Sequence, residues 1–154
     1  MALVEVTTHL PLPPDKVWAL LLRPATLVQV SAPLLSFTPR AGPLPDQWQP
    51  GEYQLGVKLF GLVPLDDQII GIEFPPHTSS GFTLRDNGRA CARDGGPGGL
   101  ITRWDHTMLV APEGSGTRYT DRVEVKAGAL TPLAALFARN LYRHRQRQWR
   151  RLLA

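Results

Sequence analysis

Cysteine is nearly absent from this chain, which has Cys91 as the single one among 154 residues. One thiol can neither form an internal disulfide nor build a structural zinc site, so neither cross-link supports the fold. The chain also lacks an apolar run near the roughly 20 residues that a membrane-spanning helix needs. Residues 1–5 contain no basic segment and no long apolar stretch. We therefore expect no signal peptide, no integral membrane segment and a cytoplasmic location.

Lysine is scarce as well, with 3 residues against 14 arginines. The net charge of +4 is unevenly distributed, because residues 127–154 contain six arginines and no acidic residue. Four of them, Arg139, Arg143, Arg147 and Arg150, recur at helical spacing, which is typical of a solvated helix face. The remainder of the chain is slightly acidic and offers no second basic stripe, so we expect no nucleic-acid partner.

The composition is that of one globular domain. Hydrophobic residues make up 43% of the chain and charged residues 19%, which excludes a disordered protein. A chain of 154 residues is long enough to bury a core of its own. No internal repeat or linker interrupts the pattern, so we interpret residues 1–154 as a single domain.

Alternation of apolar and polar residues predicts a β-rich chain with helices near both ends. Pro14 and Pro132 suit the first turn of a helix, and Thr131 suits an N-cap. Helices are predicted over residues 14–22, 25–30 and 131–154. Strands are predicted over residues 3–10, 34–38, 52–59, 68–74, 81–85, 100–110 and 117–126.

This element order predicts an α+β fold, in which a curved antiparallel sheet of six or seven strands surrounds a long C-terminal helix. Two short helices follow the first strand. The sheet has to bury one apolar face, and the last helix carries the only long apolar stripe, which includes Leu133, Phe137 and Leu141. A sheet wrapped around a helix usually leaves a space between them, and such spaces bind ligands.

Short motifs occur in order at residues 13–18, 24–27, 31–33, 104–106, 116–121 and 142–147. Taken together, they resemble the START-like, helix-grip superfamily, also called SRPBCC. The first helices and the entry to the second strand resemble the family's opening. The late hairpin and the helix after it resemble the uncharacterised bacterial ligand-binding branch, which is polyketide-cyclase-like.

The resemblance implies a fold with a cavity and leaves the activity open. Members bind lipids, sterols, polyketides or other apolar molecules, and they include cyclases, aromatases, dehydratases, carriers and co-chaperones. For this chain the resemblance implies that an apolar or amphipathic small molecule, of lipid, polyketide or aromatic type, binds between the sheet and the last helix. A cofactor-independent cyclase or dehydratase and a co-chaperone-like interaction module are the alternatives. We expect no cofactor, and no metal because the histidines lack ligand spacing.

The two long runs joined by residues 112–116 predict a β-hairpin. With its loop centred near Glu113 and Gly114, His106 pairs with Asp121 and the even-numbered residues of the first strand face inward. The residues of the opposite face are polar and are expected to contact water: Arg103, Asp105, Thr107, Arg118, Thr120, Arg122 and Glu124.

The pairing of His106 with Asp121 is the most informative feature of the sequence. A buried carboxylate needs a partner, and Asp121 should raise the pKa of His106 while burial lowers it. In an enzyme His106 would act as general base or acid, oriented by Asp121. In a carrier the pair would be a structural hydrogen bond at one end of the cavity, which is the interpretation we favour.

The predicted ligand site combines these polar groups with apolar wall residues, and no catalytic residue is assigned. An exposed strand edge and the surface around Tyr142 and Trp149 would permit a homodimer. The predicted ligand-binding residues are Tyr53, Ile70, Trp104, His106, Met108, Tyr119, Asp121, Phe137 and Leu141.

Overall fold

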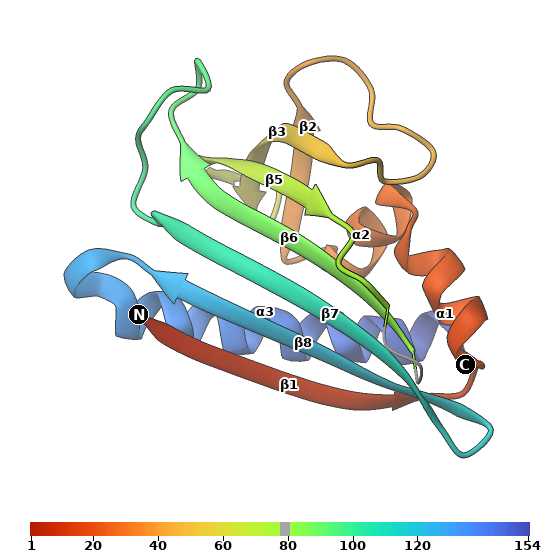
Figure 1. The fold of residues 1–154 in the computed structure, drawn as a ribbon. Coiled ribbons are helices and arrows are strands. Elements are labelled where there is room, and N and C mark those ends of the chain that lie inside the picture. Colours follow the sequence, from red (N-terminus) through yellow and green to blue (C-terminus); the bar gives the residue numbers. More distant parts are fainter. Residues whose placement is uncertain (78–80) are drawn as a thin grey trace.

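The structure is a computed structural model, and it describes residues 1–77 and 81–154. Within these residues the fold consists of one antiparallel sheet and three α-helices (Figure 1). No helix of these described residues is both long and apolar enough to cross a membrane. The elements are β1 (Ala2–Leu10), α1 (Pro14–Leu21), α2 (Pro24–Ser31), β2 (Leu35–Pro39), β3 (Gly51–Leu59), β4 (Val63–Pro64), β5 (Asp67–Glu73), β6 (Phe82–Cys91), β7 (Arg103–Glu113), β8 (Gly116–Lys126), the 3₁₀-helix η1 (Gly128–Leu130) and α3 (Thr131–Leu152).

The sheet has the strand order β1-β8-β7-β6-β5-β3-β2, and the two-residue β4 pairs with β3. The sheet curves, and α3 lies along it against β1 and β8, with α2 packed on α3 (Figure 1). This arrangement confirms the predicted α+β fold with two short helices after the first strand and a long C-terminal helix. The short strand β4 was not predicted, because Val63 and Pro64 show no alternation that sequence could reveal.

Proline sets the start of all three α-helices. Pro14, Pro24 and Pro132 each occupy the first turn of a helix. The N–H groups of that turn have no acceptor within the helix, so proline, which lacks an N–H, costs no hydrogen bond there. Asp15 adds a negative charge near the N-terminus of α1, where the helix dipole favours it. These local preferences explain why the predicted helix boundaries agree with the structure to within about two residues.

The β7–β8 hairpin differs from its predicted register by two residues. His106 lies opposite Val123, and Asp121 lies opposite Met108. The cause is a tight two-residue turn at Gly114, whose φ of +60° glycine adopts without strain. Because the shift is even, every side chain stays on its predicted face of the sheet.

Two residues of the outer face of this hairpin are buried, which contradicts the prediction that this face contacts water. Asp105 accepts hydrogen bonds from Arg85 at 2.9 and 2.7 Å and from Arg103 at 3.2 Å, and these long side chains cover it. Thr120 is covered at the sheet surface, where its hydroxyl is 3.1 Å from that of Thr7 on β1. Neighbouring strands therefore shield groups that alternation alone assigns to solvent.

The buried side of α3 is rotated from the predicted stripe. Leu133 is 62% exposed, and Phe137 is only half-buried. Tyr142 and Trp149 are 1% and 2% exposed, so they belong to the core, and the prediction that they form a surface for a homodimer is wrong. Besides these two aromatic residues, the side of α3 that packs on the sheet presents Ala134, Ala138, Leu141 and Gln146.

Candidate functional site

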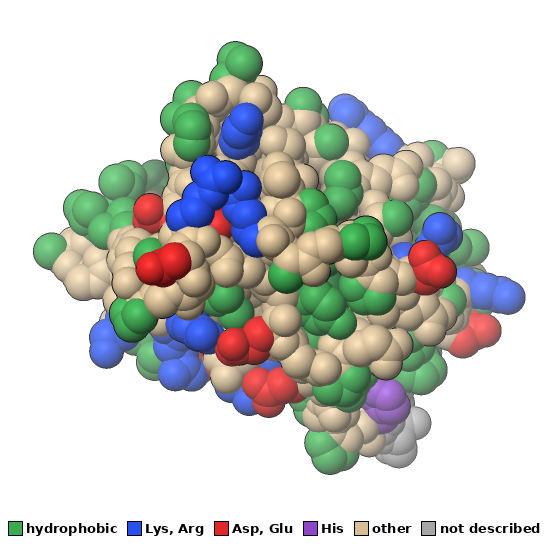
Figure 2. Space-filling model, turned by 90° about the horizontal axis from the view of Figure 1, so that it is seen from above, with side chains coloured by type: hydrophobic (Ala, Val, Ile, Leu, Met, Phe, Trp, Pro, Cys, Tyr) green, Lys and Arg blue, Asp and Glu red, His purple; other side chains and the backbone are tan. Residues whose placement is uncertain are grey.

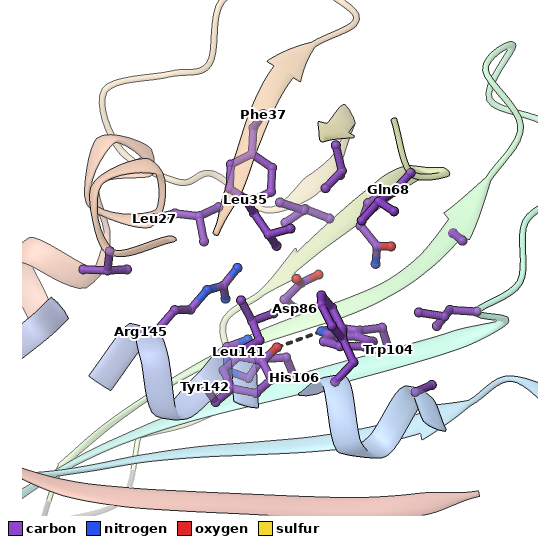
Figure 3. Close-up of a pocket in the computed structure, with 18 of the residues that line it drawn as sticks. Leu27, Leu35, Phe37, Gln68, Asp86, Trp104, His106, Leu141, Tyr142 and Arg145 are labelled. Carbon is purple, nitrogen blue, oxygen red and sulfur yellow. Dashed lines mark hydrogen bonds between the residues drawn. The ribbon is translucent and has the colours of Figure 1, made fainter. Parts of the chain in front are cut away.

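A cavity of about 630 Å³ lies between the sheet and helices α2 and α3 (Figure 3). Its size falls within the roughly 300–1,000 Å³ of small-molecule sites. Strand alternation directs side chains of β5, β6 and β7 into it, and one side of α3 closes it. Most of its lining is aliphatic or aromatic, including Leu27, Leu35, Phe37, Trp48, Ile70, Ile72, Leu84, Trp104, Met108 and Leu141.

The structure brings most of the predicted ligand contacts together around this cavity. Of the predicted set, Tyr53 and Asp121 are not among the described residues that line it. The Tyr53 ring packs edge-on against Trp48, with ring centroids 5.1 Å apart, and its hydroxyl bonds to the backbone of Gln49. Trp48 itself contributes to the wall. The predicted residues that do line it are Ile70, Trp104, His106, Met108, Tyr119, Phe137 and Leu141.

His106 and Asp121 form the predicted hydrogen bond, although the two residues are diagonal rather than directly opposite. The His106 Nε2 atom lies 2.7 Å from Asp121 Oδ1. The Tyr119 hydroxyl donates to the same oxygen at 3.0 Å, and Gln146 Nε2 donates to Oδ2 at 2.9 Å. The carboxylate, 1% exposed, is thus held by three donors from β7, β8 and α3 behind the cavity wall.

Burial determines the charge state of His106. Desolvation lowers its pKa, and its hydrogen bond to the Asp121 carboxylate opposes this with a smaller effect. His106 is therefore neutral at neutral pH, with the proton on Nε2, because the carboxylate it faces accepts hydrogen bonds. The same environment raises the pKa of Tyr119, chiefly through burial, so its hydroxyl stays protonated and remains a donor.

A cluster of aromatic side chains on α3 and β7 forms the wall beside His106. Trp104 Nε1 donates to the Tyr142 hydroxyl at 2.7 Å, which satisfies both polar groups inside the core (Figure 3). The Tyr142 ring lies 4.4 Å from the His106 ring between centroids, and the Phe137 ring lies 6.4 Å from that of Trp104. These contacts fix the orientation of the wall before any ligand binds.

The sequence reasoning missed several polar lining residues, among them Asp86 on β6 and Arg145 on α3 (Figure 3). Asp86 Oδ1 accepts a hydrogen bond from the backbone N–H of Gly71 at 2.9 Å. Burial raises the pKa of Asp86 to about 7, with the Gly71 bond and the charge of Arg145 acting against it. The predicted strand ends at residue 85. If it were extended by one residue, alternation would place Asp86 on the same inward face as Leu84.

Arg145 differs from the solvated arginines around it. Its Nε donates to Ser31 Oγ at 3.0 Å, and its guanidinium carbon lies 5.3 Å from the centroid of the Tyr142 ring. Position 145 follows Leu141 by four residues, which places both on one side of α3. The arginines expected on a solvated face, at positions 139, 143, 147 and 150, are exposed.

The cavity reaches the surface at one end, where large apolar side chains both line it and remain exposed. These residues come from the segment before β5, the loop before β7, η1 and the first turns of α3. On the face seen in Figure 2, apolar side chains also reach the surface between basic and acidic ones. We call this end the mouth, and its residues are Leu65, Leu100, Leu130, Leu133 and Leu136.

The remaining reactive groups are poor candidates for chemistry. Cys91 is buried at the end of β6, and burial together with the charge of Asp67 raises its pKa, so the thiol is not activated. Within residues 1–77 and 81–154, no three histidine, cysteine or acidic side chains are grouped in a way that could hold a metal ion.

Comparison with known proteins identifies the fold. No protein-family model and no curated protein matches the chain. Among solved structures, protein Ms6760 from Mycobacterium smegmatis is similar with a TM-score of 0.74 and 15% identity, over 99% of this chain and 90% of that one. Protein CV1439 from Chromobacterium violaceum is similar with a TM-score of 0.67 and 17% identity, over 99% and 98% of the two chains.

A third structure carries a family description. A START superfamily protein from Mycobacterium smegmatis is similar with a TM-score of 0.68 and 14% identity, over 98% of this chain and 96% of that one. At these identities the likeness concerns the fold, and it agrees with the element order described above. The chain has the START-like, helix-grip fold.

Proposed function

We propose that the protein binds one apolar or amphipathic small molecule, of lipid, polyketide or aromatic type, in the cavity between the sheet and α3. The observation that carries this proposal is a space of about 630 Å³ with a mostly apolar lining and a mouth at the surface. Transfer of apolar ligand surface from water into such a space is favourable by about 25 cal/mol per Å².

The polar groups of the site support a binding role over a catalytic one. Asp121 is enclosed by three donors and lies behind the wall, so His106 is held in one orientation by a tightly packed network. Such a network stabilises the cavity wall around His106. Trp104 and Tyr142 are already held in place by their hydrogen bond, so ligand binding loses less side-chain conformational entropy.

A second candidate is a cofactor-independent enzyme that transfers a proton through His106. The observation that favours it is that His106 lines the cavity while only its Nε2 atom is bonded to a described residue. The neutral Nδ1 would then be a base toward a ligand, with Asp121 as the orienting group. Replacement His106→Asn separates the two: a carrier keeps its affinity, whereas an enzyme keeps binding and loses turnover.

The proposal is tested by titration with 1-aminoanthracene, a neutral apolar probe whose fluorescence changes when it leaves water. Saturable binding with a stoichiometry near one per chain supports a single internal site. Non-saturable, weak enhancement would indicate adsorption at the exposed apolar residues of the mouth and would contradict the proposal.

A further inference from the structure

An acidic and a basic side chain extend into the cavity from its two sides, Asp86 from the sheet and Arg145 from α3 (Figure 3). Arg145 uses Nε for Ser31, and its two terminal nitrogens make no hydrogen bond to any described residue. The one described hydrogen bond of Asp86 comes from the Gly71 N–H. Neither group forms an ion pair within the part of the chain that the structure describes.

This arrangement contrasts with the other charged groups at or near the core. Asp67 is bonded to Arg40 through both oxygens at 3.0 Å, and Asp105 is bonded in the same way to Arg85. The fold therefore pairs its buried charges where it can. Arg145 keeps the two terminal nitrogens of its guanidinium fork directed into an apolar space, where a charge without a partner is unfavourable.

The position of Arg145 along α3 gives the orientation of a ligand. Leu133 marks the mouth, and Arg145 follows it by 12 residues, about 18 Å along a helix. On α3 the lining residues between them are apolar apart from the exposed Asn140 and from Tyr142, whose hydroxyl is bonded to Trp104. A molecule that enters with its polar end first would place that end at Arg145 and its apolar body along the wall.

We propose that the ligand carries one acidic oxygen group, such as a carboxylate, that binds the terminal nitrogens of Arg145 while its apolar body fills the space toward the mouth. The inference rests on the proposed binding function and adds the chemical class of the ligand, an amphipathic acid. Arginine presents parallel N–H donors that match a carboxylate in two-point geometry. Asp86, whose pKa is about 7, is able to donate to the same head group in its protonated form, which predominates below pH 7.

The test compares acids with matched neutral molecules as competitors of 1-aminoanthracene at pH 6, where Asp86 is mostly protonated. Two pairs are used, dodecanoic acid with 1-dodecanol and 1-pyrenebutyric acid with 1-pyrenebutanol. We expect the wild-type protein to prefer the acid of at least one pair by tenfold or more, the effect of a charge-assisted hydrogen bond. Arg145→Gln should remove this preference by weakening binding of the acid far more than binding of the alcohol.

Three variants serve as controls. Arg143→Gln removes an exposed arginine of the same helix and should leave the preference intact. Arg145→Lys keeps the positive charge and should keep part of the preference. Ser31→Ala removes the hydrogen bond from Arg145 Nε and should keep most of the preference for the acid. The affinity of each variant for the neutral probe shows whether its cavity is intact.

The outcomes separate this inference from the proposed function. Equal affinities for acid and alcohol in both pairs, with the probe bound normally, would overturn the assignment of an acidic ligand and leave the binding function standing. Equal loss of acid and alcohol in Arg145→Gln would show that Arg145 supports packing and does not bind a head group, which also overturns it. If neither the probe nor any competitor binds the wild-type protein, the binding function itself fails.

Discussion

Asp86 on β6 lies directly opposite His106 on β7 in the sheet, and both residues line the cavity. His106 is bonded through Nε2 to Asp121, whereas the carboxyl group of Asp86 has only the backbone of Gly71 as a described donor. The cavity wall thus contains His106, which has a side-chain hydrogen-bond partner, and Asp86, which has no described side-chain partner and is available to a ligand.

A charge placed in the middle of the wall should abolish ligand binding. Met108 is 7% exposed and lines the cavity, so Met108→Arg fills the space and introduces an unpaired cation. We expect 1-aminoanthracene affinity to fall at least a hundredfold, with the circular dichroism spectrum largely unchanged. Leu109→Arg is the matched control, because its side chain lies on the opposite face of β7. Unchanged probe affinity in Met108→Arg would refute the cavity assignment.

Removal of the Asp121 carboxylate should destabilise the protein. In Asp121→Ala the donors of His106, Tyr119 and Gln146 lose their acceptor inside the core. We expect the free energy of unfolding to fall by about 3 kcal/mol in urea denaturation, because an unsatisfied buried donor costs about 1–3 kcal/mol. Glu124→Ala, on the same strand and in an exposed pair with Arg103, should lower it by less than about 1 kcal/mol. Equal effects of the two variants would contradict the role given to Asp121.

The stability of the protein should depend on pH through Asp86. Its pKa is about 7 in the folded state and 3.8 as an ordinary side chain, so the folded state binds more protons between these values. The contribution of Asp86 to stability therefore decreases as pH rises from about 4 to 7. Arg145 and Asp105 are the charged groups that act on it, in opposite directions.

The replacement Asp86→Asn tests this dependence. The variant should exceed the wild type in unfolding free energy at pH 8, by up to about 4 kcal/mol, and the difference should shrink toward pH 4. His106 has a lowered pKa and causes the reverse trend below pH 6.5, but it is present in both proteins and cancels in the difference. A difference that is constant from pH 4 to pH 8 would contradict the prediction.

Polar replacements at the mouth should change the rates of binding more than stability. Leu133 and Leu136 are 62% and 57% exposed, so Leu133→Ser and Leu136→Ser remove little buried surface. We expect unfolding free energies within about 0.5 kcal/mol of the wild type. Stopped-flow measurements with 1-aminoanthracene should show altered association and dissociation rates. Leu3→Ser, at an exposed position on β1, should change neither rate, and an equal effect there would argue against the mouth.

Much of the fold follows from local signals in the sequence. Prolines at positions 14 and 132 mark helix starts, and alternation assigns faces to the strands. The inward face of the β7–β8 hairpin is correct even though its register is not, because an even shift preserves parity. The bond between His106 and Asp121 survives this shift, since diagonal neighbours across two strands remain within reach of each other.

The parts of the site that sequence missed depend on tertiary packing. Tyr53 has a suitable type, but Trp48, from an irregular loop, takes the wall position beside it. Asp86 was omitted because Asp86, Asn87 and Gly88 are poor strand formers, yet pairing with β7 extends β6 through them. In the sequence Arg145 looks like the solvent-exposed arginines around it. It turns toward the core because α2 places Ser31 within hydrogen-bonding distance of its Nε.

Native mass spectrometry of the purified protein, followed by denaturing extraction, tests the central claim most directly. The account predicts an additional mass near one small molecule per chain in the wild type and in Leu109→Arg, absent in Met108→Arg, and identified after extraction as an apolar body with one acidic group. A wild-type protein that carries no such mass, and that takes up neither 1-aminoanthracene nor dodecanoic acid when these are added, would contradict it.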